Sequence, residues 1–402
     1  MNNNYMNNFD LKIPTKFIFG KETIEKKLKD EIPEGSKVLM IYGGGSIKKN
    51  GVYDKVITAL DGYSVTEFPG VRSNPRYEKA LEAVKIIKEK EIDFLLAIGG
   101  GSVIDLTKFV ALAAVYEGND PWELTKKIKT KEEEPTKVMN FGCILTCPGT
   151  GTEGNKYCVI SKEEISEKMS VKTLLICPKF SILDPETTFT LPWRYTRNGI
   201  IDNFIHLIER YTVSDNSNFV ADRFAEQLMK ILIDCSRILK ENPKDYVARS
   251  NVMWVSSVHN MGLLEAGNYR ECWLIHLIGH QLTVMTNADH GLTLACCLKG
   301  VWTHQKKRKA AKLKMLAENV FGVTEGTDEE KVQAAIEKTI EWFKSLGMPT
   351  TLSSCNITKE DFTKIGKDID NIFMKKQKLP GIGAYFDIHG KEVIEILKLC
   401  DF

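Results

Sequence analysis

The sequence lacks the features that mark secreted, membrane-spanning and nucleic-acid-binding chains. Its 402 residues include no run of about 18 apolar residues, the length that a membrane-spanning helix needs. The polar N-terminal stretch MNNNYMNNFDLKIP has no apolar segment of the kind found in signal peptides. With 55 basic and 53 acidic residues the net charge is only +2, so no strong field attracts nucleic acid or a membrane surface. We therefore expect neither kind of partner.

Paired cysteines are lacking as well. The ten cysteines are scattered along the chain, and no two of them form a CxxC motif. A secreted disulfide framework would be denser and the chain shorter. Several thiols lie in apolar runs such as CILTC and LACCL, which suits buried thiols in a reducing compartment. We therefore expect a cytoplasmic protein, and the length is too great for a single hydrophobic core.

The first half of the chain alternates short apolar runs with amphipathic stretches. Residues 36–42 (SKVLMIY) and 93–98 (DFLLAI) are typical of buried strands, and residues 75–90 have helical spacing. Such alternation predicts a parallel, doubly wound sheet. The charged run 126–137 predicts an exposed loop. Beyond a domain boundary that we place near residue 186, helical patterns dominate, near 194–213, 217–240, 245–267, 271–285, 289–304, 307–321 and 328–346.

Two predicted strands end in the motif GGGS. These segments are Gly43, Gly44, Gly45 and Ser46, and Gly99, Gly100, Gly101 and Ser102. Glycine at the carboxyl end of a strand lets the backbone approach a phosphate, and the next helix offers free N–H groups. The second segment is the stronger one, because Ser102 can cap the helix that follows it. Neither segment is the GxGxxG fingerprint, and tight turns use glycine for backbone freedom alone. Both interpretations stay open.

A third segment, TCPGTGTE (146–153), follows the apolar strand FGCIL and is rich in hydroxyl side chains. It can place three threonine hydroxyls beside a pyrophosphate or a nicotinamide. A polar turn between sheet and loop is the alternative explanation.

Four of the seven histidines fall in two compact clusters. Asp202 and His206 are four residues apart, as are His276 and His280, so each pair shares one face of a helix. A polar turn then leads to His290, which begins the next predicted helix and can fold back. Neutral imidazoles with one carboxylate are ligands that divalent metals prefer. The alternative is that these are separate histidines satisfied by hydrogen bonds in the core.

In this order and combination, the motifs resemble those of the iron-containing alcohol dehydrogenases. The resemblance is closest to the branch of butanol dehydrogenases and NADPH-dependent aldehyde reductases. It runs over nearly the whole chain, and its parts are IPTK with FG, the first GGGS, FPGV with NP, GGGSxxD, TxPxTGTE, LDP and the paired histidine helices. It implies an α/β domain with a parallel Rossmann-like sheet over 1–186. An all-α, metal-binding domain over 187–402 would complete a dehydroquinate synthase-like fold.

The resemblance also implies roles for particular residues. The expected metal ligands are Asp202, His206, His276 and His290. His280 matches a histidine near the nicotinamide that is not a ligand, and it is the expected catalytic residue, relaying a proton to solvent. The expected cofactor-binding residues are Gly43, Gly44, Gly45, Ser46, Gly70, Asn74, Gly99, Gly100, Gly101, Ser102, Asp105, Thr146, Thr150, Thr152 and Lys168. Four protein ligands would close a tetrahedral zinc site, so an open position favours Fe²⁺, although the ligand types suit Zn²⁺ as well.

The implied activity is the interconversion of small, butanol-like primary alcohols and aldehydes. The metal would polarise the substrate oxygen, and the nicotinamide would exchange the hydride. NAD-preferring members carry an acidic residue near the ribose-binding turn. This turn has none and lies close to Lys48 and Lys49, which favours NADP(H), with NAD(H) as the alternative. The family further suggests a homodimer.

Three alternatives share the fold class. They are an NAD-dependent polyol or glycerol-type dehydrogenase, a dehydroquinate-synthase-like lyase and a non-catalytic nucleotide-binding protein. A lyase acting on a phosphorylated sugar should carry several lysines and arginines near the metal, but residues 271–290 offer only Glu271 and Asp289 as charged side chains besides histidines. Intact ligand positions argue against loss of catalysis.

The chain departs from the family pattern in three places. Thr152 stands where serine is usual, and Ile275 precedes a ligand where a small residue is commoner. The segment Arg270-Glu271-Cys272 is unusual, and no role is assigned to it.

Overall fold

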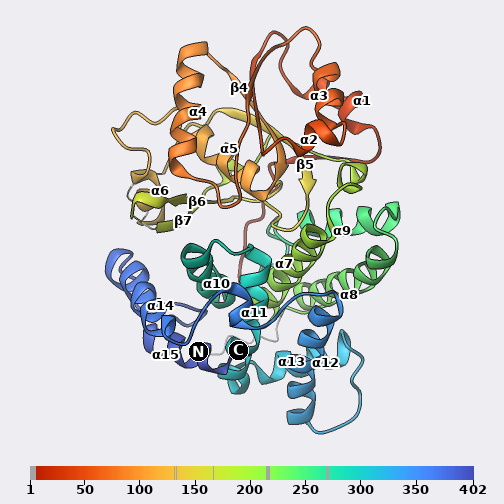
Figure 1. Ribbon diagram of the computed structural model, residues 1–402, viewed down its shortest axis with the longest axis vertical. Coiled ribbons are helices and arrows are strands. Elements are labelled where there is room, and N and C mark those ends of the chain that lie inside the picture. The colour runs from red at the N-terminus through yellow and green to blue at the C-terminus, as the bar shows by residue number, and fades with distance from the viewer. Residues whose placement is uncertain (1–5, 131, 133, 166, 214–217, 269–270) are drawn as a thin grey trace. The chain divides into compact units, whose positions relative to one another are not determined.

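A computed structural model describes the whole chain except residues 1–5, 131, 133, 166, 214–217 and 269–270 (Figure 1). The chain forms two compact units. The sheet unit comprises Lys12–Pro192 and Asn242–Met261, and the helical unit comprises Met1–Leu11, Trp193–Glu241 and Gly262–Phe402. Among the described residues, no helix combines the length and the apolar character needed to cross a membrane.

The sheet unit is built on six parallel strands in the order β1-β8-β5-β4-β2-β3. The strands are β1 (Lys16–Phe19), β2 (Lys37–Tyr42), β3 (Ser64–Phe68), β4 (Phe94–Gly100), β5 (Asn140–Cys147) and β8 (Phe180–Leu183), and the antiparallel hairpin is β6 (Tyr157–Lys162) with β7 (Glu167–Lys172). The helices are α1 (Thr23–Glu31), α2 (Ser46–Lys49), α3 (Val52–Ala59), α4 (Tyr77–Lys90), α5 (Gly101–Ala113), α6 (Glu123–Thr130) and α9 (Tyr246–Val258), with 3-10 turns at Glu163–Ile165, Leu174–Ile176 and Pro185–Thr188. The predicted parallel α/β sheet is confirmed.

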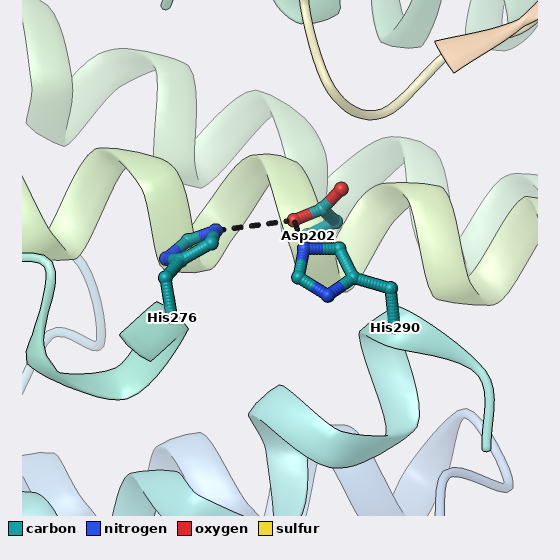
Figure 2. A group of neighbouring side chains, drawn as sticks. All are labelled: Asp202, His276 and His290. Atoms are coloured by element: carbon teal, nitrogen blue, oxygen red, sulfur yellow. Dashed lines mark ion pairs between the residues drawn. The ribbon is translucent and has the colours of Figure 1, made fainter. Parts of the chain in front are cut away.

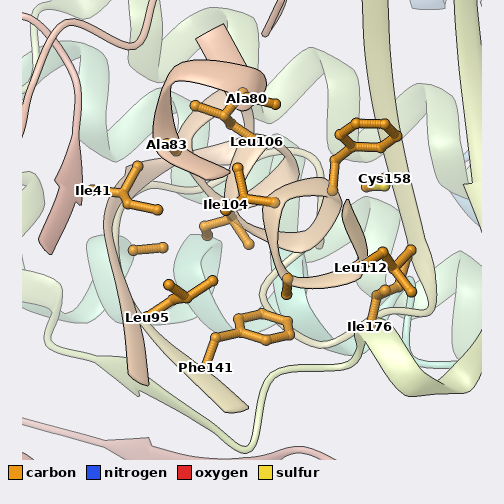
Figure 3. Packing of buried hydrophobic residues seen from close by; sticks show 14 of the residues in the cluster. Ile41, Ala80, Ala83, Leu95, Ile104, Leu106, Leu112, Phe141, Cys158 and Ile176 are labelled. Carbon is orange, nitrogen blue, oxygen red and sulfur yellow. The ribbon is translucent and has the colours of Figure 1, made fainter. Parts of the chain in front are cut away.

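Both faces of the sheet are buried at its central strands, β2, β4 and β5. Leu39 and Ile41 of β2 belong to the core that β4 and β5 form with α4 and α5, part of which Figure 3 shows. Val38 and Met40 of the same strand belong to a second core with α1 and α3. Because successive side chains point to opposite faces, a strand covered on both sides must be apolar throughout. This explains the unbroken apolar runs in the sequence.

The strand order reverses between β2 and β4. The chain runs outward from β2 to β3 on one side and from β4 to β5 on the other. In open α/β sheets, ligands bind outside the carboxyl ends of the strands at such a reversal. Because β2 ends at Tyr42 and β4 ends at Gly100, the two GGGS segments both lie there.

In its described part the helical unit has no strand and consists of packed helices. They are α7 (Trp193–Tyr211), α8 (Phe219–Glu241), α10 (Leu274–Thr286), α11 (His290–His304), α12 (Lys306–Asn319), α13 (Asp328–Ser345), α14 (Asp361–Ile369) and α15 (Gly390–Leu399), with a 3-10 turn at Leu352–Cys355 and a π-helical segment at Asp370–Lys376. The predicted helical second part is confirmed. The prediction missed α14 and α15.

Three local predictions are wrong. The helix predicted over 245–267 ends at Val258, and α9 belongs to the sheet unit. Residues 126–130 lie in α6, where Ile128 is buried, so the start of the charged run is helical and not a loop. Ser102 does not cap α5, because β4 passes directly into the helix and Gly100 occupies the cap position without a side-chain bond.

Candidate functional site

Three helices bring the predicted metal ligands together. Asp202 lies on α7, His276 lies on the first turn of α10, and His290 is the first residue of α11. Oδ1 of Asp202 is 3.6 Å from Nε2 of His276 and 3.8 Å from Nε2 of His290. One ligand atom from each residue lies within 4.8 Å of the other two, and Figure 2 shows the three side chains converging. Asp202 and His276 are buried, and His290 is half-buried.

The other two histidines of the pattern border this group. Nδ1 of His206 is 2.8 Å from the carbonyl oxygen of Asp202 and 3.2 Å from its Oδ1. The His206 ring centroid is 4.3 Å from that of His276. The His280 ring is farther away, at 5.1 Å from His290 and 6.2 Å from His276. All five predicted residues therefore lie in one cluster, with Asp202, His276 and His290 as its tightest group.

The donor atoms of this cluster fit a divalent cation. Oδ1 of Asp202 and Nε2 of His276 are buried, and neither has a hydrogen-bond partner among the described residues. Buried polar atoms rarely stay unpaired, because losing water without a replacement costs free energy. Burial would raise the pKa of Asp202, but His206 and His290 outweigh it and hold this pKa well below its usual range. Burial lowers the pKa of His206, which favours the neutral imidazole that metals bind.

A carboxylate that the sequence analysis missed lies behind His276. Glu209 of α7 contacts Nδ1 of His276, the nitrogen that faces away from Asp202. The signal was present in the sequence, because Glu209 follows Asp202 by seven residues and so shares its helix face.

Glu271 and Cys272, the described residues of the unusual segment, lie directly before Trp273. Arg270 lies outside the described residues. Glu271 accepts a 2.7 Å hydrogen bond from Nε1 of Trp273, and Cys272 is buried. The Trp273 ring packs edge-on against both His206 and His276, with centroid distances of 5.8 and 5.2 Å. The Trp273 ring therefore covers one side of the cluster.

In the sheet unit, the first GGGS segment leaves open space. A Cβ added at Gly44 or at Gly45 would meet no atom of the protein within 4 Å. Gly45 has a φ of 95°, and Ser46 starts the short helix α2. The N–H of Gly70 bonds to the carbonyl of Gly43 at 3.0 Å, which fixes the turn beside the end of β3. Packing within the protein therefore does not explain the absence of a side chain at Gly44.

The second GGGS segment is closely packed instead. A Cβ at Gly99, Gly100 or Gly101 would lie 2.5 Å from Val103, 2.8 Å from Cys147 or 2.6 Å from Thr150. None of the three glycines has a positive φ. Glycine is required here because α5 approaches residues 146–153, the threonine segment, closely. A need for backbone freedom does not explain these glycines. Ser102 is the second residue of α5.

The threonine segment is held by bonds within the sheet unit. Oγ1 of Thr152 donates to Oδ1 of Asp105 at 2.5 Å, and the other oxygen of Asp105 accepts the N–H of Val159 at 3.0 Å. These two predicted cofactor residues therefore brace each other. Thr146 lies in β5, and Thr150 follows it, half-buried.

Residues from α9 and the turn after it complete this support, and the sequence analysis missed them. Oγ of Ser256 accepts the N–H of Gly149 at 2.8 Å, and Nδ2 of Asn260 donates to the carbonyl of Thr150 at 2.9 Å. No local signal predicts contacts between segments more than 100 residues apart.

Two further predicted residues meet each other. Nζ of Lys168, on the hairpin strand β7, donates to Oδ1 of Asn74 at 3.1 Å. Asn74 has a φ of 57°, a left-handed conformation that asparagine tolerates better than most residues.

The sequence analysis also missed an acidic residue beside the first GGGS turn. Glu67, on β3 next to β2, accepts hydrogen bonds from the hydroxyls of Tyr42 and Tyr53 at 2.5 and 2.7 Å. Nζ of Lys48 lies 2.9 Å from the same carboxylate. These three donors lower the pKa of Glu67 to about 2, so it is an anion at neutral pH. Lys48 is therefore already paired.

Comparison with known protein families gives one match in each half of the chain. Residues 14–185 match the iron-containing alcohol dehydrogenase family, and residues 196–398 match the C-terminal part of the Fe-containing alcohol dehydrogenases. The chain belongs to this family, and it is an NAD(P)-dependent enzyme of the alcohol dehydrogenase and aldehyde reductase type.

Among its relatives is the NADPH-dependent aldehyde reductase YqhD of Escherichia coli, 42% identical over 367 residues, or 91% of this chain and 93% of that protein. The NADH-dependent butanol dehydrogenase A of Clostridium acetobutylicum is 36% identical, covering 98% of this chain and 99% of its own. The crystal structure of NADH-dependent butanol dehydrogenase A from Thermotoga maritima superposes with a TM-score of 0.93 at 35% identity, over 99% of this chain and 100% of that one.

Proposed function

We propose that this enzyme interconverts small primary alcohols of butanol-like size and their aldehydes, with NADP(H) as the preferred cofactor. The observation that carries the proposal is the convergence of Asp202, His276 and His290, in which Oδ1 of Asp202 and Nε2 of His276 are buried without a hydrogen-bond partner among the described residues. We include His206 as the fourth ligand, because its ring borders that of His276. The relatives named for butanol and for aldehydes support the substrate class.

When bound, the divalent metal, Fe²⁺ or Zn²⁺, supplies a Lewis acid for the substrate oxygen, and the dinucleotide supplies or accepts the hydride. The chain's own residues hold and orient these groups. With the metal bound, Asp202 would contribute a fixed negative charge, and the three histidines would contribute neutral nitrogens. His280, half-buried beside His290, is our candidate for relaying a proton to solvent.

We propose that the dinucleotide binds at the carboxyl ends of β2 and β4. The open space at Gly44 and Gly45 would take the adenosine ribose, and the start of α5 would face the pyrophosphate. Gly43, Ser46, Gly70 and Asn74 would line the first turn, and Thr146, Thr150 and Lys168 would line the second. Asp105 and Thr152 would act by holding the threonine segment in place.

The preference between the two cofactors depends on the surroundings of Lys48. Lys48 and Lys49 beside the turn support NADP(H), since a 2′-phosphate needs positive charge. Glu67 supports NAD(H) as the second candidate, because it neutralises Lys48. We further propose a domain boundary near residue 186. We also propose that the protein is located in the cytoplasm, because its ten cysteines are free thiols, as is usual in a reducing compartment. The homodimer stays a prediction from the resemblance.

The test is the oxidation of NADPH and of NADH by the purified protein with butyraldehyde, with glycerol oxidation by NAD⁺ and NADP⁺ as the comparison. We expect butyraldehyde to be reduced, faster with NADPH, and glycerol to be a poor substrate. Turnover of glycerol alone would replace the proposal with a polyol dehydrogenase. No turnover of short aldehydes or alcohols in protein that contains metal would overturn it.

A further inference from the structure

The carboxylate of Glu209 stands directly behind the metal-facing side of His276. Glu209 lies on α7 and is 2% exposed. In the described part of the chain, no lysine or arginine pairs with this carboxylate. Within the described part of the chain, the titratable side chain that contacts this carboxylate is that of His276.

Glu209 makes three contacts with the start of α10. One oxygen accepts the N–H of Ile275 at 2.7 Å, and the other accepts the N–H of His276 at 3.3 Å. The second oxygen also contacts Nδ1 of His276. Ile275 and His276 are the second and third residues of α10, and the helix has no cap from Trp273. A carboxylate from α7 thus takes the place of the missing N-cap.

These contacts also settle which nitrogen of His276 is available. A carboxylate only accepts hydrogen bonds, so Nδ1 must carry a proton where it meets Glu209. In the neutral ring Nε2 then keeps its lone pair, and it faces Oδ1 of Asp202 at 3.6 Å without a hydrogen-bond partner among the described residues. His206 differs, since its Nδ1 bonds to the backbone carbonyl of Asp202.

We propose that Glu209 is a positioning residue that fixes the tautomer and rotamer of His276 and thereby sets the affinity for the divalent metal. The inference rests on the proposed function for the identity of the metal site. Carboxylates hydrogen-bonded to ligating histidines typically contribute about 10- to 100-fold to metal affinity. A residue that merely caps α10 would affect folding and leave metal affinity unchanged.

Glu209→Gln separates these two roles. If the amide oxygen accepts the N–H of Ile275, the amide N–H₂ points to Nδ1 of His276 and favours the tautomer with a proton on Nε2, which repels the metal. If the amide is reversed, its N–H₂ faces the N–H of Ile275 and the cap is lost. We expect affinity for Zn²⁺ to fall about 10- to 100-fold.

The measurement is a competition titration of the apo full-length protein with Zn²⁺ and a chromophoric chelator, together with the thermal midpoint of the apo form. Glu226→Gln is the control, because Glu226 is equally buried in the helical unit and bonds to Tyr211, Arg223 and Asn319 but to no ligand. We expect this control to keep the wild-type Zn²⁺ affinity.

Zn²⁺ affinity within twofold of wild type in both Glu209→Gln and Glu209→Asp would overturn the proposal, because the reversed amide in Glu209→Gln alone keeps the proton on Nδ1 of His276. Should Glu209→Gln not fold, Glu209→Asp keeps the charge but shortens its reach, and we expect it to bind Zn²⁺ more weakly than wild type. Equal affinity there would also overturn the proposal. Wild-type protein that binds Zn²⁺ but turns over no aldehyde would contradict the proposed function and leave the role of Glu209 intact.

Discussion

Lys48 and Glu67 form an ion pair at the carboxyl end of β2, beside the proposed ribose site. Nζ of Lys48 also lies 4.3 Å from the centroid of the Tyr53 ring, so the ammonium is held by a carboxylate and an aromatic face together. A lysine held in this way contributes less charge to a bound 2′-phosphate than a free lysine would.

Glu67→Gln is therefore expected to shift the cofactor preference towards NADPH. The neutral amide leaves the charge of Lys48 available, and the ratio of kcat/KM for NADPH to that for NADH should rise about two- to fivefold, the size expected of one exposed charge. Steady-state kinetics with both cofactors measure this ratio. Glu91→Gln is the control, because Glu91 pairs with Lys37 at the opposite end of β2, at 2.7 Å. A ratio that stays constant or falls in Glu67→Gln would contradict the proposed role.

At the scale of single residues, spacing along a helix was a reliable guide. Asp202 with His206, and His276 with His280, lie four residues apart, and the structure gathers all of them in one cluster. Glu67 could not be found in this way. It is more than 20 residues from the turn in sequence, and only the pairing of β3 with β2 brings it close.

The two GGGS turns are elements with the same sequence and different packing. A Cβ at Gly44 meets nothing, whereas a Cβ at Gly100 would lie 2.8 Å from that of Cys147. The two positions therefore separate a role in ligand binding from a role in packing.

Gly44→Ala is expected to keep the thermal midpoint of the wild type and to bind dinucleotide about tenfold more weakly or worse, because the new methyl occupies the proposed ribose site. Gly100→Ala is expected to lower the free energy of unfolding by about 1–3 kcal/mol through overpacking. Thermal unfolding and a fluorescence titration with NADPH measure the two effects. Wild-type NADPH affinity in Gly44→Ala would place the cofactor elsewhere.

At the scale of elements, several strands and the long helices were predicted correctly, but the placement of α9 and the start of α5 were not. Strands and amphipathic helices repeat their apolar residues with a fixed period, so β2, β4, α4 and the long helices were found. The unit to which α9 belongs depends on contacts such as Ser256 with Gly149, which no periodicity records. The start of α5 was misjudged because a cap at Ser102 was assumed where the strand continues into the helix.

At the scale of the whole molecule, the sequence predicted that an α/β part is followed by a helical part, but it did not predict the order of the strands in the sheet. Alternation of strands and helices confines the sheet to a parallel form. The pairing of β1 with β8, as in Lys16 with Phe180, joins segments from opposite ends of the sheet unit. Such long-range pairing becomes visible only in the folded chain, as does the return of residues 242–261 to the sheet unit.

The central claim is that catalysis depends on a divalent metal held by Asp202, His206, His276 and His290. The most direct measurement is butyraldehyde-dependent oxidation of NADPH before chelation, after chelation, and after Fe²⁺ or Zn²⁺ is restored, with Asp202→Asn assayed in parallel. We predict that chelation lowers kcat at least about a hundredfold, that one of the two metals restores it, and that Asp202→Asn stays inactive with either metal. Full turnover in metal-free protein, or in Asp202→Asn, would contradict the account.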